Sequence, residues 1–254
     1  MSVVILQEPS THETRTIRAA SMLMDRVNAL SMPIERLQGH QTALVNGAMS
    51  VGSVEFVRAA MALAGITEPL NISYPPYCHR YLHRELKQLK AGQVLGRWFV
   101  KPLTTKTFTG FVFDTMEYPA DLSDHDQEQH RSFMALPEDA LVWVSEPVKW
   151  VSEWRYYVAH STVIGQCRYD AYGADEQPSP DISVVENCVR DMCIEHPYAI
   201  DFGVLSTGET ALVEVNDAWA IGLYGDALSP RDYLAFLRSR WRLLTRPFWI
   251  DLHD

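Results

Sequence analysis

The chain has 254 residues, enough for one large domain or for two to three small lobes with a substantial core. Apolar residues make up 47% of the sequence and charged residues 21%, which is typical of a soluble globular protein. The formal net charge of −10 argues against non-specific nucleic-acid binding, which needs a basic surface. It does not argue against binding a nucleotide, because a nucleotide needs only a local basic pocket.

The cysteine pattern favours a reduced, cytoplasmic setting. No C-x-x-C pair occurs among Cys78, Cys167, Cys188 and Cys193, so their spacing indicates no zinc site. The first residues lack the basic segment and long apolar core of a signal peptide. No apolar run reaches the roughly 18 residues of a membrane helix, so we expect no membrane partner.

The first 75 residues alternate short apolar runs with helical spacing. Ser53 is placed to cap a helix that ends at Gly65. The Gly52-Ser53 step at its N-terminus could bind an anion or serve only as that cap. The pattern predicts a small α/β lobe with a largely parallel sheet. The expected elements are a strand over 3–6, a helix over 12–30, strands over 33–37 and 43–45, and a helix over 54–64.

A proline pair after Tyr74 predicts a linker, and a basic helix is expected over 77–90. Arg84 on that helix either faces water or meets a phosphate or carboxylate. Next come two antiparallel strands, over 98–102 and 111–113, joined by a loop rich in Thr and Lys. Lys101 ends an apolar strand and Lys106 lies in the loop. Each lysine either meets an anion or lies exposed on the surface.

Residues 120–132 form an acidic polar segment that contains His125 and His130. The histidines with neighbouring aspartates suggest a metal site, but a solvated loop explains the same residues. A strand is then expected over 140–148, where Pro147 requires a sheet edge or a connecting hinge.

Two further strands, over 152–159 and 163–169, place arginines near a common cleft. Alternation puts Arg155 on one face with Glu153, and Arg168 is a second candidate for that cleft. Arginine favours bidentate contacts to phosphate. The alternative is ordinary cross-strand pairing of these arginines with Glu153 or Glu146.

The segment from Tyr198 to Asn216 carries the strongest pattern, two apolar runs around Ser-Thr-Gly-Glu. It predicts a β-hairpin, and counting outward from Thr207-Gly208 places Asp201 opposite Glu214. Asn216 shares the face of Glu214, so two carboxylates and an amide oxygen converge. These are ligands that suit Mg²⁺, although a surface hairpin with acids facing water is the alternative. Helices are expected before and after the hairpin, over 181–194 and 229–245.

Taken in order, these pieces resemble the ATP-grasp superfamily, in particular its small stand-alone bacterial and phage-encoded members. The motifs run from about Phe99 to Tyr224: a lysine strand, a lysine loop with glycine, a Ser-Glu strand end, Glu-x-Arg, and Asp followed by Glu-x-Asn. The resemblance implies an α/β (α+β) ATP-grasp fold, in which an α/β pre-grasp lobe precedes two antiparallel-sheet lobes that grip ATP. The implied domains are 1–76 and 77–254, the latter with a small lobe over about 97–148 and a large lobe over about 149–254.

The resemblance also implies roles for residues on the nucleotide side. Lys101 is similar to the strand lysine on the ATP phosphates, and Lys106 lies in what resembles the flexible phosphate loop. Glu146 and Val148 fall at the hinge that binds adenine through backbone groups, and Glu153 reaches the ribose or assists at the hinge. The loop over 104–110 departs from the family, because it is not the usual Gly/Ser-rich phosphate cover.

On the reacting side, Arg155 looks like the arginine that meets phosphate or the acyl phosphate, and Arg168 is a weaker catalytic candidate. Arg84 is a weaker candidate too. The expected catalytic residues are therefore Arg155, Arg168 and Lys106. Asp201, Glu214 and Asn216 look like the ligands of Mg²⁺, with one or two ions and with Mn²⁺ able to replace them.

The implied activity is an ATP- and Mg²⁺-dependent ligase that joins a carboxylate to an amine or a thiol through an acyl phosphate. Its substrates would be small-molecule or peptide carboxylates and amines, and the chain would act as a monomer or homodimer. Two alternatives stay open. A regulatory protein could bind nucleotide without turnover, and a metal-dependent hydrolase could use Asp201 and Glu214 alone, leaving Lys101 and Arg155 unexplained.

Overall fold

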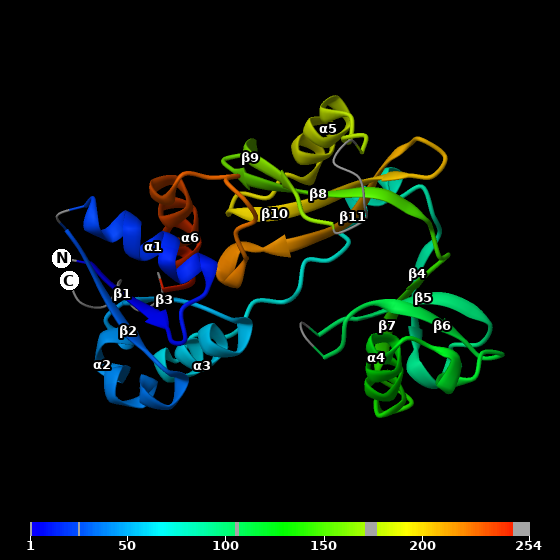
Figure 1. Cartoon of the computed structure of the whole chain (residues 1–254), viewed down its shortest axis with the longest axis horizontal. Coiled ribbons are helices and arrows are strands. Elements are labelled where there is room, and N and C mark those ends of the chain that lie inside the picture. Colours follow the sequence, from blue (N-terminus) through cyan, green and yellow to red (C-terminus); the bar gives the residue numbers. More distant parts are fainter. Residues whose placement is uncertain (1, 25, 105–106, 171–176, 246–254) are drawn as a thin grey trace.

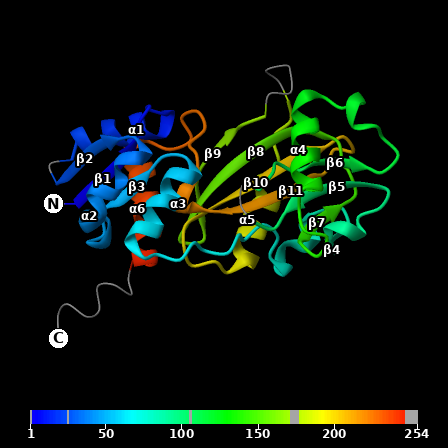
Figure 2. The ribbon, with the colours of Figure 1, turned by 90° about the horizontal axis from the view of Figure 1, so that it is seen from below.

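The computed structural model describes residues 2–24, 26–104, 107–170 and 177–245, which form three sheets with flanking helices. A parallel sheet lies in the N-terminal lobe, and two four-stranded antiparallel sheets follow (Figure 1). A second view places the same lobes along the long axis of the molecule, with the parallel sheet at one end (Figure 2). This mixed α/β architecture confirms the predicted fold class.

The parallel sheet has the order β2-β1-β3. β1 (Ser2–Gln7) is the predicted buried strand, and it lies between β2 (Val27–Met32) and β3 (Met49–Val51). The helix expected over 12–30 was predicted too long, since α1 (His12–Met22) ends before β2 begins. Apolar residues three apart fit a helix and also the start of the next strand, so spacing alone did not locate the boundary.

The two other short strands predicted in this lobe are wrong. Residues 33–37 fall in the 3-10 helix η1 (Ile34–His40), and residues 43–45 fall in α2 (Gln41–Val45). A short apolar run is compatible with either structure. The next helix is confirmed in full: α3 (Val54–Ala64) begins after Ser53, whose Oγ accepts the Phe56 N–H at 3.3 Å, and ends at Gly65 with a φ of 72°.

The small antiparallel sheet has the order β4-β7-β5-β6. The basic helix expected over 77–90 was wrong. That segment forms the 3-10 helix η2 (Pro76–Tyr81) and then β4 (Leu86–Lys90), which pairs along its whole length with β7 (Leu141–Ser145). Pairing with a distant strand overrides the local helical spacing. The predicted antiparallel pair is present as β5 (Arg97–Pro102) and β6 (Phe111–Asp114).

One face of the small sheet is covered by α4 (Asp124–Met134), which replaces the solvated loop expected there. Ser123 caps this helix by accepting the Asp126 N–H at 3.1 Å. Phe133 packs into the core of the small lobe, and the His130 ring stacks on Phe113 with 5.7 Å between centroids. His130 is thus a packing residue. Short 3-10 helices precede and follow β5 and β6, η3 (Ala91–Gln93) and η4 (Pro119–Asp121).

The large antiparallel sheet has the order β11-β10-β8-β9. Its strands match the predicted ones; they are β8 (Trp150–Ala159), β9 (Thr162–Arg168), β10 (Tyr198–Leu205) and β11 (Thr210–Asp217). Every residue of β10 is buried, as expected for a central strand. The predicted helix α5 (Ile182–Met192) covers one face through Val185, Cys188, Val189 and Met192.

The chain returns to the N-terminal lobe at its end. After η5 (Ala218–Ala220), α6 (Pro230–Thr245) packs beside α1 on the parallel sheet (Figure 1). β4 likewise lies ahead of the residue 97 boundary expected for the small lobe. Among the described residues, no helix has the length and apolar content needed to cross a membrane.

Candidate functional site

The hairpin β10–β11 holds Asp201 opposite Glu214, the pairing that the sequence predicts. Closer to the turn, Phe202 pairs with Leu212, so Val213 is an extra residue that forms a β-bulge. The regular ladder assumed in counting from the turn is therefore absent. The turn lies half a residue from the assumed centre, and the bulge restores the expected pairing at Glu214.

Arg84 holds this bulge from outside the sheet. Its guanidinium donates to the carbonyl oxygens of Leu212 at 2.8 Å and Val213 at 3.2 Å, and it lies 5.5 Å from the Trp150 ring. Burial lowers the pKa of Arg84 below its usual value. The sequence suggested a phosphate or carboxylate partner, but these hydrogen bonds go to the backbone next to Glu214.

Arg155 and Asp201 form a buried bidentate pair across β8 and β10. Two hydrogen bonds join them, at 2.8 Å and 2.6 Å, and the residues are 7% and 0% exposed. Burial alone would lower the pKa of Arg155, but the charge and hydrogen bonds of Asp201 outweigh it and raise the pKa. The rings of Tyr169 and Tyr224 lie 5.3 Å and 5.1 Å from the guanidinium carbon, which fixes its position.

Lys101 brings the small sheet to the large one. Its ammonium pairs with Glu214 Oε2 and lies 5.2 Å from the Tyr74 ring. Asn216 donates from Nδ2 to Glu214 at 2.9 Å and to Asp201 at 3.2 Å. Burial lowers the pKa of Lys101 to about 8. Two cations and two carboxylates thus converge with Asn216 on one face.

Two cavities meet at this cluster and share Asn71, Glu214 and Asn216 in their linings. The first has a volume of 360 Å³ and extends past Arg155 to the N-terminus of α3 in the pre-grasp lobe. The second, 390 Å³, extends along Lys101 and the loop at Thr107–Gly110 to α4. Glu214 and Asn216 are therefore accessible from both sides, whereas Asp201 lines neither cavity.

Other predicted residues lie away from the cluster. Glu146 is exposed and accepts the Glu85 N–H at 3.1 Å, and neither it nor Val148 lines the two cavities. Glu153 accepts the Tyr169 hydroxyl at 2.8 Å, and burial raises the pKa of Glu153 above its usual value. Lys106 lies outside the described residues.

The structure separates Arg168 from Arg155. Arg168 pairs across the strands with Trp154, whereas Arg155 pairs with Cys167, so the two arginines take opposite faces of the sheet. Arg168 Nη2 binds Asp170 at 2.7 Å instead. The expectation that both arginines face one cleft is wrong, because adjacent positions on a strand alternate.

The linker before η2 contributes residues that the sequence did not single out. The Ser73 carbonyl accepts the Val215 N–H at 2.9 Å, which fixes the linker against β11. Asn71 consequently lines both cavities, and Tyr74 packs edge-on against Trp143 at 5.3 Å below Lys101. No periodic pattern marks these residues, because their position depends on the path of the linker.

The donor set of the cluster is small for a metal site. Among the described residues, no group of three or more His, Cys, Asp or Glu side chains is arranged to hold a metal ion. The cluster instead offers Glu214 and the Asn216 amide, both reached from the cavities. Oxygen donors of this kind fit Mg²⁺, which keeps several waters and needs few protein ligands. Both Asp201 oxygens already accept hydrogen bonds from Arg155.

Solved structures with the same fold include ATP-grasp ligases. The ligase PsnB, complexed with a phosphomimetic variant of its minimal precursor, Mg and ADP, matches 95% of this chain and 97% of its own, with a TM-score of 0.50 and 13% identity. D-alanyl-alanine synthetase A from Vibrio cholerae gives 97%, 98%, 0.50 and 12% in the same order. N5-carboxyaminoimidazole synthetase from Staphylococcus aureus gives 94%, 77%, 0.52 and 8%.

These identities establish the fold alone. The sequence matches none of the curated proteins at a significant level. A family model described as an ATP-grasp domain, the second family of its clade, matches residues 81–236, which is well over half of the chain. That range contains Lys101, Arg155 and the hairpin with Asp201 and Glu214. The chain therefore belongs to this family of ATP-grasp domains.

Proposed function

We propose that the protein is an ATP- and Mg²⁺-dependent ligase that joins a carboxylate to an amine or a thiol through an acyl phosphate. The observation that carries the proposal is the convergence of Lys101, Arg155 and Glu214 where two cavities meet. Membership of an ATP-grasp family supports ATP as the substrate that one of these cavities receives.

The charges of the cluster suit phosphoryl transfer. Lys101 lines the second cavity and Arg155 the first, so a phosphoryl group at their junction would meet a cation from each side. Both cations are held in place without ligand, Lys101 by Glu214 and Arg155 by Asp201. Such preorganised charges stabilise a transferring phosphoryl group without reorganisation during the reaction.

The chemistry proceeds in two steps. A carboxylate oxygen of the substrate attacks the γ-phosphorus, and the bond from that phosphorus to the β–γ bridging oxygen breaks to release ADP. The amine nitrogen or thiol sulfur then attacks the acyl carbon, phosphate leaves with the electrons of the C–O bond, and the nucleophile gives its proton to water. Arg155 orients the acyl phosphate between the two steps.

Mg²⁺, held by Glu214 and Asn216, would neutralise phosphate charge and polarise phosphoryl oxygens. Asp201 is the third expected ligand, but Arg155 occupies both of its oxygens. Glu214 exchanges its Lys101 partner for the metal, and this leaves the Lys101 ammonium free for a phosphate. The chain thus uses its own cations to hold the ligand carboxylates until substrate arrives.

The test is ADP release with Mg-ATP against panels of amino acids, peptides and polyamines. Hydroxylamine serves as a general nucleophile that converts an acyl phosphate into a stable hydroxamate. The proposal expects ADP only when a carboxylate is present, with hydroxamate formed in equal amount. ADP release without a carboxylate would indicate a hydrolase, and ATP binding with no turnover across the panels would indicate a regulatory protein.

A further inference from the structure

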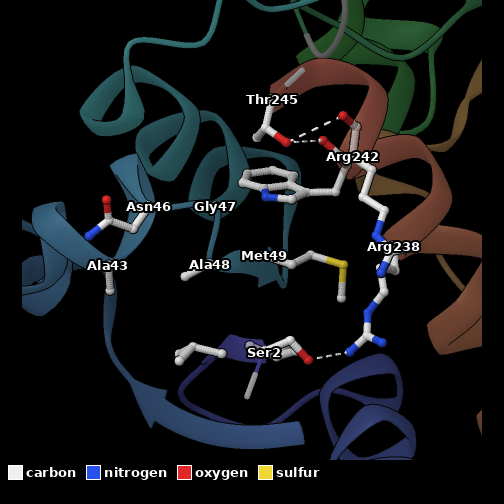
Figure 3. Close-up of a pocket in the computed structure, with 12 residues that line it drawn as sticks. Ser2, Ala43, Asn46, Gly47, Ala48, Met49, Arg238, Arg242 and Thr245 are labelled. Carbon is white, nitrogen blue, oxygen red and sulfur yellow. Dashed lines mark hydrogen bonds between the residues drawn. The ribbon is translucent and has the colours of Figure 1, made fainter. Parts of the chain in front are cut away.

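A third cavity lies in the N-terminal lobe, away from the candidate site. It has a volume of 760 Å³, in the range of pockets that bind small molecules. Ser2, Val3 and Val4 of β1 form one wall, Ala43 to Met49 another, and α6 the third. Figure 3 shows Arg238 and Arg242 on one side of the pocket, facing Ala43 and Asn46 across it.

The pocket lies at the opposite end of the parallel sheet from the ATP-grasp cluster. β1 starts at Ser2 in the pocket and ends at Gln7. The Gln7 side chain accepts the Ser53 N–H at 2.5 Å, and Ser53 lines the first cavity of the cluster. A strand of this length spans roughly 16–20 Å. A ligand in the pocket would therefore not contact a nucleotide at Lys101.

Two arginines give the pocket its charge. Arg238 and Arg242 are four residues apart on α6, a spacing at which like charges repel. Neither forms a salt bridge with an acid in the described part of the chain, although Arg238 donates to Ser2 Oγ at 2.6 Å. Burial, and then the charge of Arg242, lowers the pKa of Arg238. In a protein with a net charge of −10, two neighbouring arginines with no acidic partner in that part of the chain indicate space for an anion.

Trp241 supplies a second, independent observation. It lines the pocket, is only 3% exposed, and its indole N–H has no hydrogen-bond partner among the described residues. A buried donor left without an acceptor costs about 1–3 kcal/mol. A ligand that brings an acceptor into the pocket would remove that cost. The rest of the lining is largely apolar, including Val4, Ala48 and Met49.

We propose that this pocket binds an organic acid with an apolar body. The acid group lies against Arg238 and Arg242, an acceptor atom meets the Trp241 N–H, and the body packs on the apolar wall. The site is separate from the nucleotide site, so it serves an effector of the enzyme or a second ligand of the lobe.

The probe is 8-anilinonaphthalene-1-sulfonate, an anion with an apolar body whose fluorescence rises on burial, titrated into the full chain. One site is expected, with binding weakened about tenfold or more by Arg238→Gln or Arg242→Gln, the scale of a lost charged hydrogen bond. Ala43→Trp fills the pocket and should abolish binding. Arg231→Gln, at an exposed position on the same helix outside the pocket, should change nothing.

Decanoate should displace the probe, and Mg-ATP should not. Circular dichroism confirms that each variant is folded. The proposal is wrong if the uncharged analogue N-phenyl-1-naphthylamine binds as tightly, if the arginine variants bind normally, or if Mg-ATP competes. Binding that appears only after removal of residues 246–254, or pelleting of the chain with phosphatidylglycerol vesicles, would also overturn it. The last result would indicate a lipid surface instead of a free acid.

Discussion

Arg155 on β8 and Asp201 on β10 lie directly opposite one another and share two hydrogen bonds, at 2.8 Å and 2.6 Å, inside the large sheet. This pair gives Asp201 a task that is independent of any metal, since it neutralises a buried arginine. Loss of function after mutation of Asp201 would therefore not by itself identify a metal ligand. Glu214, partly exposed and facing both cavities, is the residue on which the metal assignment can be tested.

The first prediction concerns stability. Asp201→Ala should lower the free energy of unfolding by about 3–5 kcal/mol, because it leaves the Arg155 guanidinium buried without a partner. Arg155→Met combined with Asp201→Leu should regain most of that loss, because no charge is then buried. Urea unfolding measures both. Asp191→Ala, which removes the exposed partner of Arg80, is the control and should change little. Equal losses in the single and double variants would contradict the prediction.

The second prediction separates the metal site from the hairpin that carries it. Glu214→Gln should reduce Mg-ATP turnover by about 100-fold or more, since charge stabilisation by the metal is lost, while the unfolding midpoint changes little. Glu209→Gln alters an exposed carboxylate on the same hairpin, outside both cavities, and should keep full turnover. If the two variants turned over ATP at the same rate, Glu214 would have no role in the reaction.

The third prediction follows from the depressed pKa of Lys101. With a pKa of about 8, Lys101 is charged below that pH and loses its charge above it. The dissociation constant for ATP, measured at constant free Mg²⁺, should therefore rise between pH 7 and pH 9, by at most about tenfold per pH unit. Lys101→Met should bind ATP weakly and without this dependence, and exposed Lys90→Met should keep it. A wild-type affinity that is flat across this range would remove Lys101 from the phosphate site.

The fourth prediction concerns the bulge beside Glu214. Arg84→Met removes the donors to Leu212 and Val213, which should lower the unfolding free energy by about 2–4 kcal/mol. Turnover should fall as well, because the bulge sets the register of Glu214. Arg84→Lys should not restore turnover, since one ammonium cannot reproduce the two-pronged contact. Arg97→Met, at an exposed position on β5, serves as control. Normal turnover in Arg84→Met would show that the bulge holds its register unaided.

The predicted parts of the site are those specified by local sequence. A turn with glycine between two alternating strands placed Asp201 opposite Glu214, and alternation put Arg155 on the face of Glu153. Lys101 was found because a charge at the end of an apolar strand needs a partner. Each of these inferences uses neighbours within about ten residues, where backbone period and turn chemistry decide the outcome.

The parts that were missed depend on contacts distant in the sequence. The helix predicted over 77–90 became β4 because β7, more than fifty residues later, pairs with it. Arg84 became a bulge clamp through carbonyls of β11, and Tyr74 reached the site along the linker. The assignment of Arg168 failed differently, because strand alternation alone would have placed it on the opposite face from Arg155 if the register of β8 and β9 had been known.

The most direct test of the proposed ligase site is a crystal structure of the chain with Mg²⁺ and ADP. The account predicts a metal bound to Glu214 and to the Asn216 amide oxygen at about 2.0–2.1 Å. It also predicts that the Lys101 ammonium has left Glu214 for a phosphate oxygen. A nucleotide bound elsewhere, with Lys101 and Glu214 still paired and no metal beside them, would contradict it.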